Sequence, residues 1–263
     1  MKGIVLAGGT GSRLHPVTIA VSKQMLPIYD KPMIYYPLST LMLAGIREIL
    51  IITTPHDQPS FEKLLGTGEK FGISLTYEVQ ASPRGLADAL LVGESFLNGD
   101  RCCLILGDNL FYGPGLGTQL QRYSEVEGAL IFGYQVADPT VYGVAEIDLS
   151  GRVLSIEEKP RFPKSHFAVP GIYFFDDAAS KFAHELTPSK RGELEITALL
   201  QKYLDRDALR AVVLQRTTSW LDTGTHESLF EASGLIRTLQ HRSGLRIGDI
   251  DQIARDHGWI DSV

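Results

Sequence analysis

The sequence predicts an α/β protein with a Rossmann-like three-layer sandwich, in which helices cover a mostly parallel central sheet, together with a smaller sheet-rich lobe. In the first half of the chain, apolar runs of strand length alternate with segments of helix length. These runs are apolar on both faces, as in parallel sheets that helices cover on each side. In the second half, shorter strand-like segments are separated by turns, which favours antiparallel pairing.

Each element of the first half is predicted from its apolar pattern and from the turn residues at its ends. Residues 4–7 form a continuous apolar run that predicts a first strand. Asp30 is expected to be the N-cap of a helix over 33–44, with Pro32 near its first turn and Gly45 after its end. The remaining elements are strands over 48–53, 73–80 and 102–106 and helices over 61–65 and 86–96.

The second half contains shorter predicted elements and no internal repeat or long linker. Its strands are expected over 129–136, 143–148, 153–157 and 168–175, and its helices over 180–186, 194–204 and 226–241. We therefore expect one domain over 1–241, with the sheet-rich lobe interleaved at roughly 110–220, and a tail over 242–263.

The amino-acid composition of the chain excludes several classes of function. The chain has 263 residues, 44% of them hydrophobic, which is enough to bury a large core without metal or disulfide support. Its formal net charge of −6 argues against nucleic-acid binding through a basic surface. No apolar segment suits a signal peptide or a membrane span. The adjacent Cys102 and Cys103 point to opposite faces of a strand and are poorly placed to bond each other, so we expect reduced thiols and a cytoplasmic protein.

A glycine-rich loop follows the first strand and ends on a cation. Gly8, Gly9 and Gly11 let the backbone N–H groups approach phosphate oxygens, and Arg13 adds a planar donor fork. The loop lacks the Gly-Lys pair of a P-loop, and Leu14 stands where a dinucleotide fingerprint has its third glycine. A polyphosphate site is the first hypothesis, and a tight turn without a ligand is the alternative.

Other polar residues stand at the ends of predicted strands. Lys23 is close enough in sequence to reach the same phosphates. Asp108 follows the strand over 102–106, and Asp222 has a similar apolar-then-glycine context, so the two could share a magnesium ion with phosphate oxygens and water. A turn-forming role remains the alternative for Asp108.

Two further segments indicate recognition of a sugar phosphate and of a base. Glu158 could accept hydrogen bonds from hydroxyls while Lys159 holds a phosphate, although an exposed charged turn is the simpler interpretation. Gln80, followed by Pro83 and Gly85, could contact a base edge, although an isolated Gln is usually a surface residue.

The chemistry that fits these residues is nucleotidyl transfer. The sequence has no Gly-x-Ser-x-Gly elbow, no metal-type cluster of His or Cys and no HExxH motif. A sugar phosphate is already ionised and can attack an α-phosphate directly, so the protein has to supply alignment, charge neutralisation and a metal.

Seven motifs occur in the order found in one known family. They resemble glucose-1-phosphate thymidylyltransferases, also called dTDP-glucose pyrophosphorylases, of the sugar nucleotidyltransferase family, and the match extends to about Gly244. The motifs lie at 6–14, 22–24, 30–37, 106–109, 157–160, 191–197 and 220–225.

The resemblance implies a nucleotide-diphospho-sugar transferase fold and the conversion of dTTP and α-D-glucose 1-phosphate into dTDP-glucose and pyrophosphate with Mg²⁺. It implies a nucleotide-sugar pathway such as dTDP-rhamnose or deoxysugar synthesis, and a homodimer or homotetramer. Carried over by position, the nucleotide site is Leu6, Gly8, Gly9, Gly11, Ser12, Arg13, Gln24, Gln80, Pro83 and Gly85, the phosphate-neutralising lysines are Lys23 and Lys159, the metal ligands are Asp108 and Asp222, and the sugar site is Asn109, Tyr142, Gly143, Glu158 and Val169.

The sequence also departs from the pattern of that family. Arg84 and Asp88 stand where the family usually has Asp and Gln, beside the implied base site. The chain also stops at Val263, short of the usual helical C-terminus, which leads to the hypothesis of weaker feedback inhibition by dTDP-rhamnose and altered assembly.

Three other functions are weighed against this one. The first is a related nucleotidyltransferase that uses UTP or another sugar phosphate. A nicotinamide-dependent oxidoreductase rests only on the glycine loop, whose motif is incomplete. A non-catalytic nucleotide-sugar sensor would require loss of a catalytic residue, whereas Arg13, Asp108 and Asp222 are all present.

Overall fold

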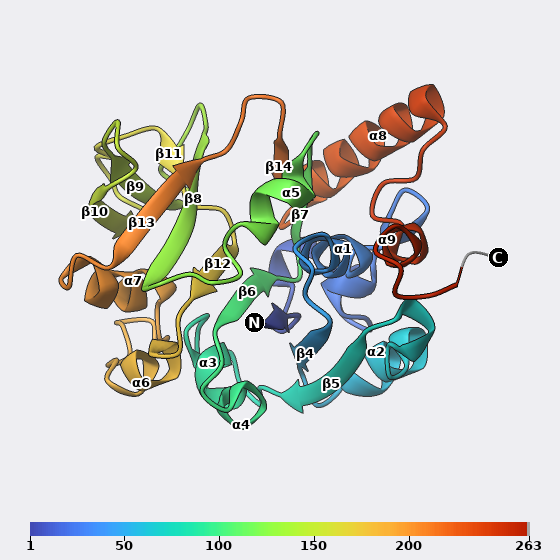
Figure 1. Cartoon of the computed structure of the whole chain (residues 1–263), viewed down its shortest axis with the longest axis horizontal. Helices are drawn as coiled ribbons and strands as arrows, with labels where there is room; N and C mark the ends of the chain where they lie inside the picture. The colour runs from blue at the N-terminus through green and yellow to red at the C-terminus, as the bar shows by residue number, and fades with distance from the viewer. Residues whose placement is uncertain (262–263) are drawn as a thin grey trace. The chain divides into compact units, whose positions relative to one another are not determined.

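The computed structural model describes residues 1–261 and contains two compact units (Figure 1). Unit 1 comprises residues 84–104 and 123–216 together with Met1, and unit 2 comprises residues 2–83 and 105–122 and the chain from 217 onward. The chain crosses between the units within β6 (Cys102–Leu106). The predicted α/β class is confirmed.

Unit 2 is built on parallel strands, and the two inner ones, β1 (Lys2–Leu6) and β4 (Glu48–Thr53), are buried on both faces along most of their length, whereas β5 (Ser74–Val79) has one exposed face. β1 and β5 each pair in parallel with β4, with Val5 opposite Ile51. The apolar run of β4 from Ile49 to Ile52 is fully buried, as expected for the middle strand of a covered parallel sheet. The carboxyl end of β6 lies beside that of β1, since the Gly107 N–H donates to the Leu6 carbonyl at 2.9 Å.

A second pair of strands in unit 2 was not predicted from the sequence. β7 (Asn109–Tyr112) and β14 (Ser219–Asp222) pair in antiparallel fashion, which places Asn109 opposite Asp222. Only Gly107 and Asp108 separate the end of β6 from the start of β7, so the polar residues of this turn are positioned by the pairing of β7 with β14. The arrangement positions most of the predicted metal and sugar ligands of unit 2.

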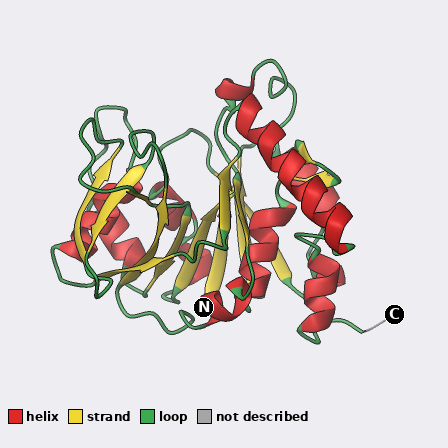
Figure 2. Ribbon diagram, turned by 90° about the horizontal axis from the view of Figure 1, so that it is seen from above, coloured by secondary structure: helices red, strands yellow, loops and turns green. Residues whose placement is uncertain are grey.

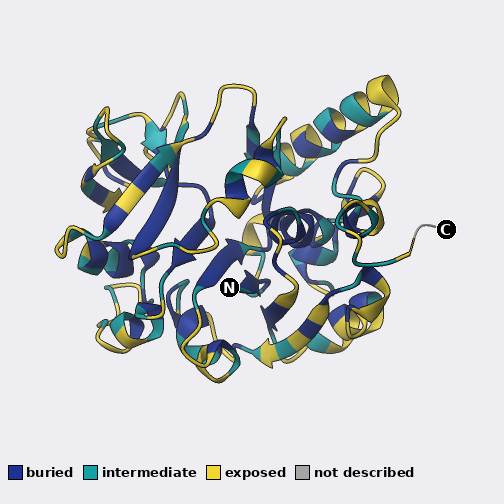
Figure 3. Cartoon of the chain, viewed as in Figure 1, coloured by how far each residue is buried: buried dark blue, intermediate teal, exposed yellow. Residues whose placement is uncertain are grey.

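Helices complete unit 2, and α8 (His226–Ser243) is the longest of those described. Its N-terminus has a capping box between Thr225 and Ser228, and it buries Ala232 and Ile236 in a cluster with Met33 of the polypeptide before α1. α8 lies along the outside of unit 2 (Figure 2). Its side away from this cluster is exposed (Figure 3). The other helices of unit 2 are α1 (Tyr35–Leu43), α2 (Gln58–Leu65), α5 (Leu116–Gln121), α9 (Ile250–Asp256) and the short 3₁₀ turns Ser12–Leu14, Lys23–Met25 and Glu69–Phe71.

The prediction that Asp30 caps a helix is wrong. Residues 27–32 form a hairpin of β2 (Pro27–Ile28) and β3 (Lys31–Pro32), and α1 begins only at Tyr35. Tyr29 occupies the left-handed region at φ 59°, which closes the turn. The Asp30 carboxylate accepts hydrogen bonds from Lys31 at 2.6 Å and from Gln240 at 3.2 Å instead of from a helix N-terminus.

The strands of unit 1 are mostly in antiparallel pairs, as predicted for the second half of the chain, but they are not all short, since β8 (Ala129–Gln135) has 7 residues. β8 pairs in antiparallel fashion with β11 (Phe167–Ala168) and β12 (Ile172–Phe175) and in parallel with β13 (Leu209–Val213). β9 (Gly143–Ile147) pairs with β10 (Val153–Glu158) and with β11, both antiparallel. The helices are α3 (Asp88–Val92), α4 (Glu94–Leu97), α6 (Ala179–His184) and α7 (Ile196–Leu204).

Two predicted elements of unit 1 are each divided in two. The helix predicted over 86–96 is interrupted at Gly93, and the strand predicted over 168–175 is interrupted around Pro170 and Gly171. Glycine favours breaks in helices and proline breaks strand pairing, so both interruptions have a local cause.

Cys102 and Cys103 are both buried and unbonded, as predicted, and burial raises the pKa of the Cys102 thiol to about 12. Within residues 1–261, no helix has the length and apolar character needed to cross a bilayer.

Candidate active site

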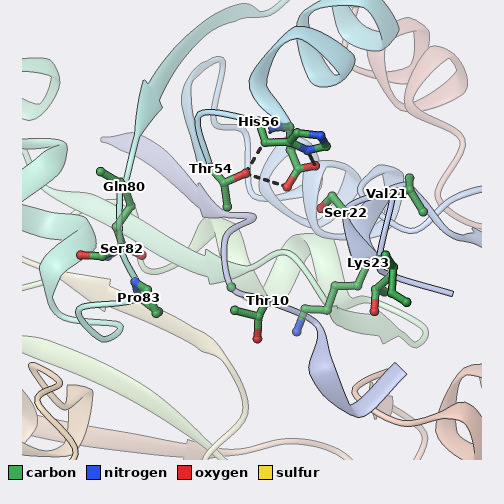
Figure 4. Close-up of a pocket in the computed structure, with 14 residues that line it drawn as sticks. Thr10, Val21, Ser22, Lys23, Thr54, His56, Gln80, Ser82 and Pro83 are labelled. Carbon is green, nitrogen blue, oxygen red and sulfur yellow. Dashed lines mark hydrogen bonds and ion pairs between the residues drawn. The ribbon is translucent and has the colours of Figure 1, made fainter. Parts of the chain in front are cut away.

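The glycine-rich loop lines a cavity of about 260 Å³ that lies within unit 2. Figure 4 shows Gln80 and Pro83 on one wall, Lys23 on the other, and Thr10 of the loop between them. Gly9 also lines this cavity. The structure therefore brings together residues that the sequence assigned to phosphate binding and to base recognition.

The loop has the backbone conformation that its glycines predict. Gly9 and Gly11 occupy the left-handed region, at φ 93° and φ 59°. The Thr18 hydroxyl donates to the Gly11 carbonyl at 2.8 Å and closes the loop on itself. Ser12 and Arg13 then lie in the 3₁₀ turn that follows.

The two predicted glutamines both lie close to Gly8. Gln80 is buried, and its Oε1 lies 3.6 Å from the position that a Cβ on Gly8 would occupy. The Gln24 amide donates to the Gly8 carbonyl at 3.4 Å, while its own oxygen accepts from the Ser22 hydroxyl at 2.6 Å. The turn between β1 and the loop is thus held by side chains of the predicted nucleotide site.

Asp108 is at the centre of a hydrogen-bonded chain of four side chains. The Lys23 ammonium forms an ion pair with Oδ2 of Asp108, and the Asn109 amide donates to Oδ1 at 3.1 Å. The Trp220 indole N–H in turn donates to the Asn109 amide oxygen at 2.6 Å. Burial by itself raises the pKa of Asp108, but the Lys23 charge and the hydrogen bonds outweigh it and hold this pKa below its usual value.

The second predicted metal ligand, Asp222, lies at the end of the same ladder. Its Cα is paired with that of Asn109, and the next residue, Thr223, donates to the Asp108 carbonyl from its N–H at 3.1 Å and from its hydroxyl at 2.8 Å. A Cβ on Gly224 would lie 3.1 Å from Oδ1 of Asp222 and 2.5 Å from Nη2 of Arg13. Residues that are far apart in sequence therefore meet at one place in unit 2.

The donor set at this place fits a hard divalent cation. Asp108 and Asp222 supply carboxylate oxygens, the type of ligand that Mg²⁺ prefers. Oδ2 of Asp108 forms an ion pair with the Lys23 ammonium, which a metal ion at this oxygen would have to displace. Among residues 1–261, no group of three or more His, Cys, Asp or Glu residues is arranged to hold a metal, so a bound Mg²⁺ would need further oxygens from substrate or water.

The predicted sugar residues of unit 1 form a second cluster. Glu158 is paired across β9 and β10 with Gly143, and a Cβ on that glycine would lie 3.4 Å from Oε2 of Glu158. The Lys159 N–H donates to the Tyr142 carbonyl at 3.0 Å, and the Val169 N–H donates to the Gly143 carbonyl at 2.8 Å. Three segments that the sequence assigned to sugar binding, at 142–143, 158 and 169, are therefore side by side, whereas Asn109 belongs to unit 2.

The environment of Glu158 favours its neutral form. Burial raises the pKa of its carboxyl above the ordinary value; Lys159 and Arg191 oppose this, and Glu193 and Glu195 add to it. Arg191 itself forms a bidentate ion pair with Glu195, with both nitrogen–oxygen distances at 2.9 Å. Burial therefore outweighs the nearby positive charges, of which the Lys159 ammonium lies 3.9 Å from Oε1 of Glu158.

This pKa shift predicts a pH-dependent effect of Glu158→Gln on stability. A carboxyl whose pKa is raised by folding destabilises the folded protein once it is ionised. This destabilisation is absent at pH values below the ordinary pKa of the carboxyl and is complete at pH values above its raised pKa. We expect the Tm of Glu158→Gln to match that of the wild type at about pH 4 and to exceed it at about pH 8. A Tm difference that is the same at both pH values, measured by differential scanning calorimetry, would contradict this assignment.

Several residues of these clusters were not singled out from the sequence. Trp220 and Thr223 lie within the motif 220–225, but only Asp222 of that motif was given a role. Their hydrogen bonds to Asn109 and to Asp108 fix the carboxylate's surroundings. The sequence did contain a signal for both residues: Trp220 has an indole N–H and Thr223 a hydroxyl, and both stand close to Asp222. Such groups need hydrogen-bond partners when they are buried.

Comparisons with known proteins agree with this geometry. The family model for nucleotidyl transferases matches residues 2–238. The chain is 56% identical over 261 residues to a glucose-1-phosphate thymidylyltransferase of Mycolicibacterium smegmatis, covering 99% of this chain and 91% of the relative. It is also 56% identical to a protein of the same name from Xanthomonas campestris pv. campestris, covering 99% of this chain and 89% of the relative.

A solved structure has the same fold. The crystal structure of a Bacillus anthracis protein assigned as a glucose-1-phosphate thymidylyltransferase, in complex with sucrose, superposes with a TM-score of 0.83 at 43% identity and covers 90% of this chain and 95% of that one. A UDP-glucose pyrophosphorylase in complex with UDP-glucose superposes with a TM-score of 0.80 at 26% identity, covering 90% of this chain and 98% of that one.

Proposed function

Since this chain belongs to the nucleotidyl transferase family, we propose that its two clusters of side chains carry out the chemistry of that family. The chain is an enzyme that transfers the thymidylyl group of dTTP to α-D-glucose 1-phosphate, giving dTDP-glucose and pyrophosphate. The observation that carries the assignment of the reaction centre is the meeting of Arg13, Lys23, Asp108 and Asp222 in unit 2. A family resemblance also supports a homodimer or a homotetramer as the assembly.

In this proposal, the nucleotide binds in the cavity of unit 2. The backbone N–H groups from Gly8 to Ser12 cradle the triphosphate, and Gln80 contacts the base edge. Lys23 neutralises a phosphate group, and Arg13 stabilises the negative charge that develops on the departing pyrophosphate. These contacts align the α-phosphorus for attack.

The cluster of unit 1 holds the sugar phosphate. Glu158 accepts hydrogen bonds from sugar hydroxyls, and its raised pKa is lowered again when these donors arrive. Lys159, whose side chain is half-exposed, pairs with the sugar's phosphate. The backbone at Gly143 and Val169 completes the surface that excludes water from the sugar ring.

The reaction is then an in-line displacement. An oxygen of glucose 1-phosphate forms a bond to the α-phosphorus of dTTP as the bond from that phosphorus to the pyrophosphate oxygen breaks. Alignment of the reactants by itself can lower the barrier by roughly 7–11 kcal/mol. A Mg²⁺ ion held by Asp108 and Asp222 would supply Lewis-acid neutralisation of the phosphate oxygens.

A panel of substrates tests this function. We expect purified protein with Mg²⁺ to release pyrophosphate from dTTP only when glucose 1-phosphate is present, and mass spectrometry to identify dTDP-glucose. Nicotinamide dinucleotides should leave Tm unchanged. Faster turnover with UTP or with another sugar phosphate would support the related nucleotidyltransferase, and absence of turnover with every pair would support the non-catalytic sensor.

A further inference from the structure

The segment that follows the nucleotide cavity is closed by an ion pair. Pro83 is the last residue that lines the cavity, and the next residue, Arg84, begins unit 1. Nη2 of Arg84 lies 2.8 Å from Oδ1 of Asp88, four residues later in the first turn of α3. The Asp88 side chain is 2% exposed and that of Arg84 is 60% exposed, so the guanidinium covers a buried carboxylate from the solvent side.

The same segment is attached to a second part of unit 1 through its backbone. The Leu194 N–H donates to the Arg84 carbonyl at 2.7 Å, and the Ala87 N–H donates to the Leu194 carbonyl at 3.1 Å. Between these bonds, Gly85 has φ 105°, and a Cβ there would collide with the Leu194 carbonyl oxygen. Gly85 therefore allows the close approach, and the two hydrogen bonds fix the path of the backbone.

Leu194 connects this segment to the sugar cluster. It lies between Glu193 and Glu195 in the stretch that precedes α7, and Glu195 is held by Arg191 and by the Ser189 hydroxyl at 2.7 Å. Charges of this stretch act on Glu158.

Arg84 and Asp88 form an i, i+4 ion pair in which the carboxylate is buried and the guanidinium is exposed. Changing only one of them would leave a buried carboxylate without its cation, or a cation without its carboxylate, and both arrangements are unfavourable. The presence of both in one i, i+4 pair indicates that they act as a unit.

We propose that Arg84 and Asp88 are positioning residues that hold the backbone of residues 83–85 in place for recognition of the nucleotide base. This inference rests on the proposed function, in which Gln80 contacts the base, and on the sequence-based expectation that Pro83 and Gly85 lie beside it. Neither side chain of the pair takes part in the chemical step. The pair acts by fixing where the backbone groups beside the base lie, and the contact with Leu194 maintains that position.

The test compares Arg84→Gln, Asp88→Asn and Arg84→Lys with a matched control, Arg152→Gln. Arg152 is 59% exposed and pairs with Asp207 at 3.2 Å, so it resembles Arg84 in exposure but lies in a different turn of unit 1. Misplacement by about 1 Å can reduce rates by up to about 100-fold. We expect Arg84→Gln and Asp88→Asn to raise KM for dTTP by about tenfold and to lower the preference for dTTP over UTP, with kcat changed by less than about twofold.

Arg84→Lys keeps the positive charge and is expected to recover most of the affinity for dTTP. Calorimetric titration with dTTP should rank the Kd values of the variants in the same order as their KM values. The proposal is overturned if the Arg84 and Asp88 variants keep the wild-type KM and base preference, as Arg152→Gln should. It is also overturned if they lose Tm and both substrate affinities together, as in a general loss of structure. Failure of the proposed function is distinguishable, because the wild type itself would then form no dTDP-glucose.

Discussion

Replacement of Arg13 by Ala is expected to lower kcat by about 100- to 1,000-fold, the effect of removing one donor that stabilises developing negative charge. Arg13 follows the glycine loop, and its guanidinium lies beside Gly224 near Asp222. The departing pyrophosphate would therefore leave without its planar bidentate partner.

The fold should be unaffected by this substitution. Arg13 belongs to a 3₁₀ turn whose buried residue is Leu14, so Ala at position 13 leaves the packing unchanged. Circular dichroism and Tm should match those of Arg246→Ala, a control that removes an arginine which is 63% exposed and pairs with Asp30 at 3.6 Å. Arg13→Lys should regain part of the rate, because it restores charge without the fork. Turnover of Arg13→Ala within a factor of a few of wild type would remove Arg13 from the mechanism.

The sequence predicts best those features that local patterns encode. The buried strand β4 and the glycine loop have continuous apolar and glycine-rich signals, and both were placed within a residue or two. The short strand β14 was missed because four residues carry too little periodicity to be distinguished from a loop. Asp30 was misassigned because its acid-then-proline context suits both a helix cap and a hairpin, and pairing of β2 with β3 decides between them.

In the candidate site, too, local patterns predict some features and only the fold determines the others. Asp108 could be named from its position after an apolar strand, but its partners could not. Lys23 is 85 residues away in sequence, and Trp220 is 111 residues from Asn109. Contacts over such separations depend on how β7 and β14 pair, which no local pattern records. The position of a polar residue at the end of a strand can therefore be predicted from the sequence, whereas its hydrogen-bonded surroundings require the fold.

Asp108→Asn should have the largest combined effect on activity and stability. Loss of one carboxylate from the site proposed for Mg²⁺ removes several kcal/mol of charge stabilisation, which corresponds to a fall of roughly 100- to 10,000-fold in kcat/KM. The same change leaves the Lys23 ammonium, only 15% exposed, without its counter-charge. Breaking a buried ion pair in this way costs about 3 kcal/mol of unfolding free energy. Asp222→Asn should lower kcat/KM to a similar extent. Both variants should need more Mg²⁺ than the wild type to reach half of their maximal rate.

Three measurements separate these two effects of Asp108. The pKa of Asp108 is held below its usual value, so its contribution to stability is present above the ordinary pKa and is lost as the pH falls through the lowered one. The deficit in Tm of Asp108→Asn should therefore shrink towards acidic pH. Adding Lys23→Met to Asp108→Asn should recover stability without activity, because both members of the ion pair are then neutral. Mg²⁺ titrations of pyrophosphate release should show a higher half-saturating concentration for Asp222→Asn. An unchanged Mg²⁺ response in both variants would exclude these carboxylates as metal ligands and leave Asp108 as the anchor of Lys23 alone.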